Sequence, residues 1–128
     1  MAIRALAELG RVVIVGRGAV YLTGDMAGGV HVRLVAPDGV RIARKAESAG
    51  VSVDAAGALV RDTDRAREAF YRRHWPGRPL APEAFAMTLN TAKLSVGQQV
   101  NAVLAAMPGD GRNATEAADR GRAVAKTA

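Results

Sequence analysis

Arginine side chains concentrate in one stretch of this chain, residues 61–73, which reads RDTDRAREAFYRR. At about 100° per residue, an α-helix places Arg61, Arg65 and Arg72 on one face. Guanidinium groups this close together repel one another unless an anion lies opposite them, and the planar guanidinium matches the geometry of phosphate oxygens. The pattern therefore predicts a helix that presents arginines to a polyphosphate.

The alternative is a solvated helix face without a ligand. Asp62, Asp64 and Glu68 belong to the same stretch and can offset the arginine charges through i, i+4 pairs. Spacing alone leaves both interpretations open. The opposite face carries the residues that we expect to pack inward: Leu59, Thr63, Ala66 and Phe70.

Composition excludes several kinds of site. The 128 residues carry a net charge of +6, no cysteine and two histidines, His31 and His74, far apart in the sequence. Thiolate metal sites, disulfides and Cys/His nucleophiles are therefore absent. Basic charge also suits nucleic acid, but aromatic residues make up only 4% and do not alternate with the basic ones. A base-stacking surface is disfavoured for that reason.

Neither end of the sequence predicts a membrane segment. Residues 2–9 lack the long apolar centre of a signal peptide, and no apolar run approaches the roughly 20 residues of a membrane span. We therefore expect a cytoplasmic protein.

The first strand predicted by the pattern is Val12 to Val15, a continuous β-branched run typical of a strand buried on both faces of a parallel sheet. It leads into Gly16-Arg17-Gly18, a turn at the carboxyl end of the strand, where open α/β sheets bind ligands. A dinucleotide fingerprint is not favoured, because Tyr21 stands at the third glycine position and no amphipathic helix is predicted after it.

The remaining elements alternate between helices and strands. They predict an α/β fold with a three-layer parallel sheet and flanking helices. Three strands make a thin sheet, so we expect it to look incomplete on its amino-terminal side, with an exposed apolar edge or face that favours self-association. The expected helices are 2–9, 37–48, 53–75 and 96–107, the last with a capping box at Ser95 and Gln98; the further strands are 30–35 and 85–89; residues 108–128 are expected to be a disordered tail.

Four collinear blocks resemble the cytidylate kinase-like family of P-loop nucleoside-monophosphate kinases. The resemblance covers about residues 2–107, and it is closest to the carboxyl-terminal half of that family. It implies one kinase-like domain over residues 1–107, with a helical lid around 38–78. The four blocks are GRVVIVGRGA at 10–19, VHVRLVAP at 30–37, TDRAR at 63–67 and LNTAKLS at 89–95.

The resemblance also implies roles for individual residues. The turn of Gly16, Arg17 and Gly18 is similar to the acceptor-site turn whose arginine contacts the monophosphate. Gly18 stands where cytidylate kinases have an acidic residue that recognises the base. This difference from the family pattern argues against specificity for cytidine. The lid would supply nucleotide-phosphate contacts from Arg41 and Arg44, and the catalytic charge would come from Arg61, Asp64, Arg65 and Arg67.

The implied reaction is ATP-dependent phosphorylation of a nucleoside monophosphate, with Mg²⁺ as the accompanying ion. It proceeds by charge neutralisation and needs no protein nucleophile. The family's glycine-rich phosphate loop is missing, since no Gly-x-x-x-x-Gly-Lys-Ser/Thr occurs in the sequence. We therefore expect a truncated kinase half that is inactive alone. The alternatives are a non-catalytic phosphate binder, or a partner of a chain that supplies the phosphate loop.

Overall fold

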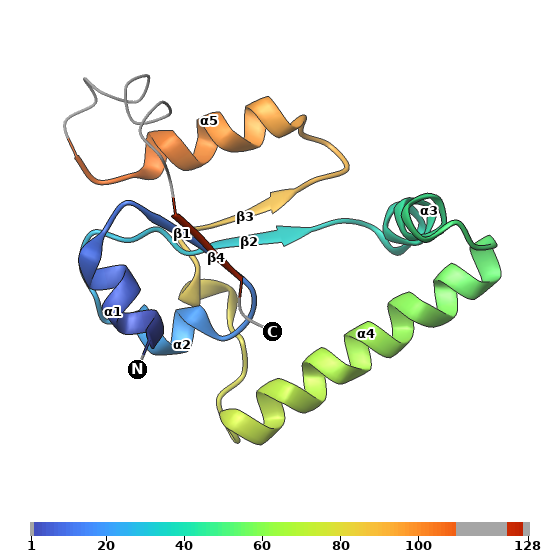
Figure 1. The fold of residues 1–128 in the computed structure, drawn as a ribbon, viewed down its shortest axis with the longest axis horizontal. Coiled ribbons are helices and arrows are strands. Elements are labelled where there is room, and N and C mark those ends of the chain that lie inside the picture. Colours follow the sequence, from blue (N-terminus) through green and yellow to red (C-terminus); the bar gives the residue numbers. More distant parts are fainter. Residues whose placement is uncertain (1, 110–122, 127–128) are drawn as a thin grey trace.

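In the part of the chain that the structure describes, helices dominate and four short strands form two separate pairs (Figure 1). The structure is a computed structural model, and it describes residues 2–109 and 123–126. In chain order the elements are α1 (Ala2–Leu9), β1 (Val12–Val15), α2 (Ala19–Thr23), β2 (Val32–Val35), α3 (Asp38–Ala49), α4 (Val53–His74), the 3₁₀ turn η1 (Pro82–Ala84), β3 (Met87–Asn90), α5 (Val96–Ala106) and β4 (Ala123–Lys126).

The long helices begin and end where the sequence predicts. The Ser52 hydroxyl accepts a hydrogen bond from the Ala55 N–H at the start of α4. Ser95 and Gln98 form both bonds of the expected capping box at the start of α5. Gly50 ends α3 in the left-handed conformation, with φ of 64°. These predictions are confirmed. Caps can be predicted from local sequence because each one satisfies backbone groups within its own helix turn.

The strands do not form the single three-layer sheet that the pattern predicts. β2 and β3 pair in parallel, with Leu34 opposite Leu89, and the two helices α3 and α4 form the crossover between them. β1 instead pairs in parallel with β4, with Val12 opposite Ala123. The α/β class and the parallel pairing are confirmed, whereas one continuous sheet through β1 is not observed among the described residues.

β4 lies inside the segment that was expected to be a disordered tail. Residues 123–126 are a strand there, while the rest of the predicted tail beyond Gly109 lies outside the described residues. Its sequence, Ala-Val-Ala-Lys, lacks the continuous β-branched run that predicts the strand at residues 12–15. Its backbone satisfies hydrogen-bonding groups along one edge of β1.

A second difference is α2, a five-residue helix directly after the Gly16 to Gly18 turn, where no helix was expected. Gly18 adopts a φ of 76° before α2 and is buried under the ring of Trp75. The Tyr21 and Trp75 rings stack with centroids 4.7 Å apart, and the Tyr21 hydroxyl donates to the Arg78 carbonyl at 2.9 Å. These contacts attach the carboxyl-terminal end of α4 to α2.

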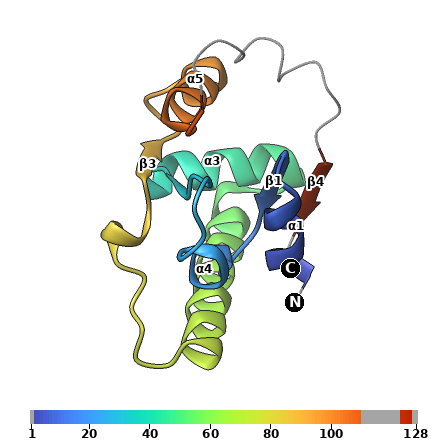
Figure 2. The same cartoon turned by 90° about the vertical axis from the view of Figure 1, so that its left-hand side faces the viewer.

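The main helix contact joins α3 and α4, which cross in Figure 2. The buried residues of α4 are Ala56, Gly57 and Val60. The prediction that this helix packs inward through Leu59 and Ala66 is wrong, because both residues are exposed. Small residues carry little hydrophobic signal in a sequence, yet they let two helix backbones approach closely.

Of the apolar edge or face expected to be exposed on the amino-terminal side, the structure shows an exposed face, whereas one edge of β1 is paired with β4. Val13 and Val15 of β1 are both exposed, while Val12 and Ile14 on the other face are half-buried. Among the described residues, no helix is both long enough and apolar enough to cross a bilayer.

Candidate phosphate-binding groove

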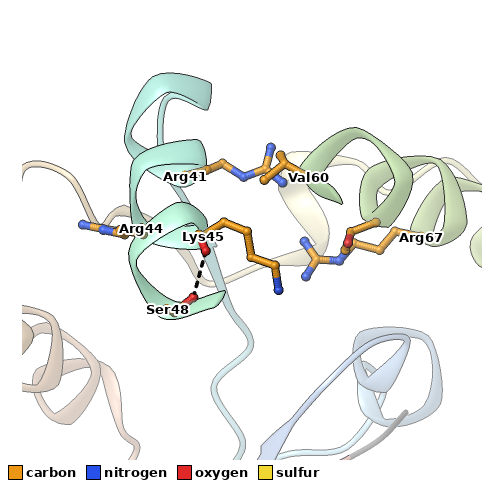
Figure 3. A pocket seen from close by; sticks show the side chains of 7 residues that line it. Arg41, Arg44, Lys45, Ser48, Val60 and Arg67 are labelled. Carbon is orange, nitrogen blue, oxygen red and sulfur yellow. Dashed lines mark hydrogen bonds between the residues drawn. The ribbon is translucent and has the colours of Figure 1, made fainter. Parts of the chain in front are cut away.

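α3 and α4 enclose an open groove with a cavity of about 410 Å³. We call it the α3–α4 groove (Figure 3). Four cationic side chains contribute to its walls, together with small and apolar ones. The lining residues are Arg41, Arg44, Lys45 and Ser48 from α3 and Val60, Thr63 and Arg67 from α4.

At one end of the groove, Arg41 binds Asp64 of α4 through two hydrogen bonds. Arg41 Nη1 donates to Asp64 Oδ2 at 2.8 Å, and Nη2 donates to Oδ1 at 2.5 Å. Arg41 also donates to Asp38 at 3.1 Å. The bonds from Arg41 lower the pKa of the Asp64 carboxyl and raise that of the Arg41 guanidinium. The pair therefore fixes the two helices to each other with both groups ionised at neutral pH.

Lys45 and Arg67 extend from the two helices towards one another across the groove (Figure 3). Arg67 has Asp64 as its nearest carboxylate, at 4.0 Å, and that carboxylate is already held by Arg41. Lys45 forms no ion pair within the described part of the chain. Two cations thus face the same space, and the carboxylate that lies 4.0 Å from Arg67 is already held by Arg41.

Arg44 points away from Lys45 and Arg67 (Figure 3). Its Nη1 donates to Thr91 Oγ1 at 2.7 Å, and its Nη2 donates to the Thr91 carbonyl at 2.8 Å. The Thr91 N–H in turn donates to the Val35 carbonyl. Arg44 therefore attaches α3 to the carboxyl ends of β2 and β3, so its guanidinium is already engaged in the described structure.

The other two arginines expected to act in the lid lie outside the groove. Arg65 is exposed and pairs with Asp62 one turn earlier on α4. Arg61 is exposed beside Gly57 and does not line the cavity. Of the predicted catalytic set, the structure brings Asp64 and Arg67 together, and it separates Arg61 and Arg65 from them.

The turn of Gly16, Arg17 and Gly18 is also separate from the groove, because none of its residues lines the cavity. The face of Gly18 is covered by Trp75, so a β-carbon there would lie 2.3 Å from Trp75 Cη2. The predicted substrate-binding role of this turn stays a prediction.

Lys45 is the one cationic groove residue that was not among the predicted site residues. It lies one helical turn after Arg41, on the polar side of a helix already assigned to the lid. That spacing could have identified Lys45 as a neighbour of Arg41 on the same side of the helix. Which polar residue of α3 faces α4 depends on how the helices cross, which the sequence does not encode locally.

The chemistry of the groove suits an anion. Guanidinium and ammonium groups donate hydrogen bonds and carry positive charge, whereas metal ions need oxygen, nitrogen or sulfur acceptors. Across the described residues, no group of three or more His, Cys, Asp and Glu side chains could hold a metal ion.

Comparison with known proteins identifies the family of this chain. The sequence model of the cytidylate kinase-like family matches residues 1–93. No curated protein and no solved structure matches the chain. The match includes the amino-terminal residues of the chain, so it does not support the narrower expectation of a carboxyl-terminal half alone. It spans β1, the turn of residues 16–18, α3, α4 and β3, and this chain therefore belongs to the cytidylate kinase-like family.

Proposed function

We propose that this chain binds the phosphate groups of a nucleotide in the α3–α4 groove, as the lid part of a nucleoside-monophosphate kinase. One observation carries the proposal: Lys45 and Arg67 face each other across a cavity, and the carboxylate near Arg67 is occupied by Arg41. A phosphate placed between the two cations would neutralise charge that the protein itself leaves uncompensated.

In this proposal the residues have different tasks. Arg67 and Lys45 contact phosphate oxygens and stabilise the charge of phosphoryl transfer. Asp64 is a positioning residue, because it holds Arg41 and keeps the two helices at a fixed separation. Arg44 positions α3 through Thr91. Nearly all of the catalytic effect would come from placement and electrostatics.

ATP and Mg²⁺ are implied only by the family to which the chain belongs. The groove offers cations to phosphate oxygens, but Asp64 is its nearest carboxylate, and Arg41 already uses both Asp64 oxygens. An Mg²⁺ ion accompanying ATP would therefore take its ligands from the nucleotide and water. The sequence contains no phosphate-loop motif, so this chain alone does not supply the donor-phosphate cradle.

A second candidate function is non-catalytic phosphate binding, either alone or beside a chain that supplies the phosphate loop. The absence of the Gly-x-x-x-x-Gly-Lys-Ser/Thr motif favours it. In that arrangement the exposed valines of β1 offer the apolar surface against which such a chain would pack.

The test is thermal unfolding in the presence of pyrophosphate. Binding should raise the melting temperature, as any ligand of the folded state does, and added salt should reduce the shift. The double substitution Lys45→Ala and Arg67→Ala should abolish it. The matched control is Arg61→Ala with Arg65→Ala, which removes the same charge outside the groove and should keep most of the shift.

Equal loss of the shift in both double variants would show that net charge alone attracts pyrophosphate. Retention of the shift without Lys45 and Arg67 would contradict the groove as the binding site. Both variants replace groups on accessible surfaces, so the fold should survive them.

A further inference from the structure

The lysines of this chain lie in different surroundings. They are Lys45 on α3, Lys93 in the turn between β3 and α5, and Lys126 in β4. Lys45 lines the α3–α4 groove, and Lys93 does not. Both of these side chains are exposed, and neither forms an ion pair in the described part of the chain. The two amines therefore differ in their neighbours and not in their access to solvent.

The neighbour that distinguishes Lys45 is the guanidinium of Arg67. The Lys45 side chain extends from α3 towards Arg67 of α4, and both line the same cavity of about 410 Å³ (Figure 3). The carboxylate that lies 4.0 Å from Arg67 belongs to Asp64 and is already bound by Arg41. Arg67 therefore keeps hydrogen-bond donors for an incoming phosphate. An amine stands across the groove from the place where that phosphate would bind.

An amine beside a phosphate-binding cation is placed to react with an acyl phosphate. In this class of compound a single oxygen joins the phosphorus to the carbonyl carbon. The group that Arg67 would hold and the group that an amine attacks are therefore adjacent. Thioesters, another class of acyl donor, carry no phosphate next to the carbonyl, so the groove gives them no comparable placement. Holding two reactants together in this way raises the rate as an intramolecular reaction does.

We propose that Lys45 is a modification site, acylated without a further enzyme by small acyl phosphates that bind to Arg67 through their phosphate. This inference rests on the proposed function, because it needs a groove that binds phosphate. The Lys45 ammonium group first loses a proton to solvent, and the neutral amine attacks the carbonyl carbon. A C–N bond forms while the bond from the carbonyl carbon to the bridging oxygen breaks. The nitrogen gives a second proton to the departing phosphate, and the products are an amide and inorganic phosphate.

Acylation of Lys45 would regulate the groove. An acylated lysine is neutral and has lost its ammonium donors. Of the two cations that face each other across the cavity, Arg67 alone would then keep its charge, while Arg41 and Arg44 are already hydrogen-bonded within the protein. Polyphosphate therefore binds the modified chain more weakly, and bound polyphosphate in turn protects Lys45 from acylation.

Peptide mass spectrometry tests the proposal, because it follows Lys45 and Lys93 separately in one sample. With acetyl phosphate, Lys45 should be acetylated at least about tenfold faster than Lys93. With acetic anhydride, which carries no phosphate, the two rates should agree within about threefold, since both side chains are exposed. Pyrophosphate should slow the reaction of Lys45 with acetyl phosphate and leave that of Lys93 unchanged. Equal rates at the two lysines with acetyl phosphate would overturn the proposal.

A matched pair of substitutions locates the phosphate that directs the reaction. Arg67→Ala should bring the acetyl phosphate rate of Lys45 down to that of Lys93, without changing its rate with acetic anhydride. Arg61→Ala removes the same charge outside the groove and should leave both rates of Lys45 unchanged. Both arginines are exposed, so the fold should survive, and the melting temperature without ligand checks this. Equal effects of the two substitutions would overturn the role of Arg67.

The pyrophosphate shift in melting temperature separates this proposal from the proposed function. If pyrophosphate stabilises the parent protein but Lys45 and Lys93 react equally with acetyl phosphate, the groove binds phosphate and acylation of Lys45 is refuted. Absence of both the shift and the preference for Lys45 would overturn both proposals. Where Lys45 is acetylated selectively, the modified protein should show a smaller pyrophosphate shift than the parent protein.

Discussion

Gly18, the residue before α2, lies against the ring of Trp75, the residue after α4. A β-carbon there would lie 2.3 Å from Trp75 Cη2, and φ is 76°. Gly18→Ala should destabilise the protein by about 2 kcal/mol or more, from left-handed strain plus overpacking. Urea unfolding followed by Trp75 fluorescence measures this directly, because Trp75 is the only tryptophan.

Gly28→Ala is the control for that experiment. Gly28 has a φ of 87°, but nothing lies within 4 Å of a β-carbon built on it. Its replacement carries the backbone strain alone, about 1 kcal/mol. If the two alanine variants lose the same stability, the packing of Trp75 over Gly18 is not tight.

The Arg41–Asp64 pair makes the stability of the protein depend on pH. The bonds from Arg41 lower the pKa of Asp64 in the folded state. A carboxyl with a lowered folded pKa stabilises the fold fully above its unfolded pKa, near about 4, and this stabilisation is lost as pH falls through the folded pKa.

Asp64→Asn should therefore reduce the free energy of unfolding by about 1 kcal/mol at pH 7, a value discounted for the partial exposure of the pair. The difference from the parent protein should shrink below about pH 4. Chemical unfolding at pH 7 and pH 3 measures both values. Asp62→Asn, which breaks an exposed pair with Arg65, should change little. A pH-independent loss in Asp64→Asn would contradict the role of its charge.

Among the helices, α4 shows both what the sequence predicts and what it leaves out. Its start and its end near Trp75 follow from the Ser52 cap and from Pro76, which are local signals. Its inward face does not follow, because Ala56 and Gly57 look neutral in an apolar pattern. The site residues were hard to select for the same reason. Arg67 and Asp64 were expected in the lid, but the sequence does not show that they face α3 while Arg65 does not.

Gly57 gives a test of the α3–α4 contact. It is buried within α4, and a β-carbon there would lie 3.8 Å from Ile42 Cδ1, an ordinary contact distance. The nearest atom, Arg61 Nη1 at 3.3 Å, ends an exposed and flexible side chain. Gly57→Ala should therefore stabilise the protein by about 0.5–1 kcal/mol, because alanine loses less backbone entropy in a helix.

Gly57→Leu should do the opposite, since its extra atoms would push α3 and α4 apart. Thermal unfolding of both variants gives the comparison. A loss of stability in Gly57→Ala would mean that the helix backbones are closer than ordinary contact. If Gly57→Leu leaves the thermal stability unchanged, the α3–α4 contact rearranges easily to make room for the larger side chain.

At the scale of the whole molecule, the sequence predicted the element order far better than the pairing of strands. β2, β3 and their helical crossover were expected and are confirmed. The pairing of β1 with β4 joins Val12 to Ala123, across most of the chain. Nothing local encodes such a pairing, because each strand only offers unpaired backbone groups to whichever edge comes near.

The last prediction concerns the activity of the chain by itself. We expect no measurable phosphotransferase activity with ATP and CMP, because the sequence has no phosphate-loop motif to cradle the donor phosphates. A coupled assay for ADP release should give only background at the concentrations where the protein is folded. Turnover of even about 1 s⁻¹, the low end for kinases, would contradict this expectation.

The pyrophosphate experiment decides what an inactive result means. Inactivity together with a pyrophosphate shift that depends on Lys45 and Arg67 would identify a phosphate-binding lid without a donor site. A chain that carries a phosphate loop should then restore turnover, and Arg67→Ala should reduce the restored rate by more than tenfold, as expected for a group that stabilises phosphoryl-transfer charge. Arg61→Ala outside the groove should leave that rate within a few-fold, because its guanidinium does not face the bound phosphate.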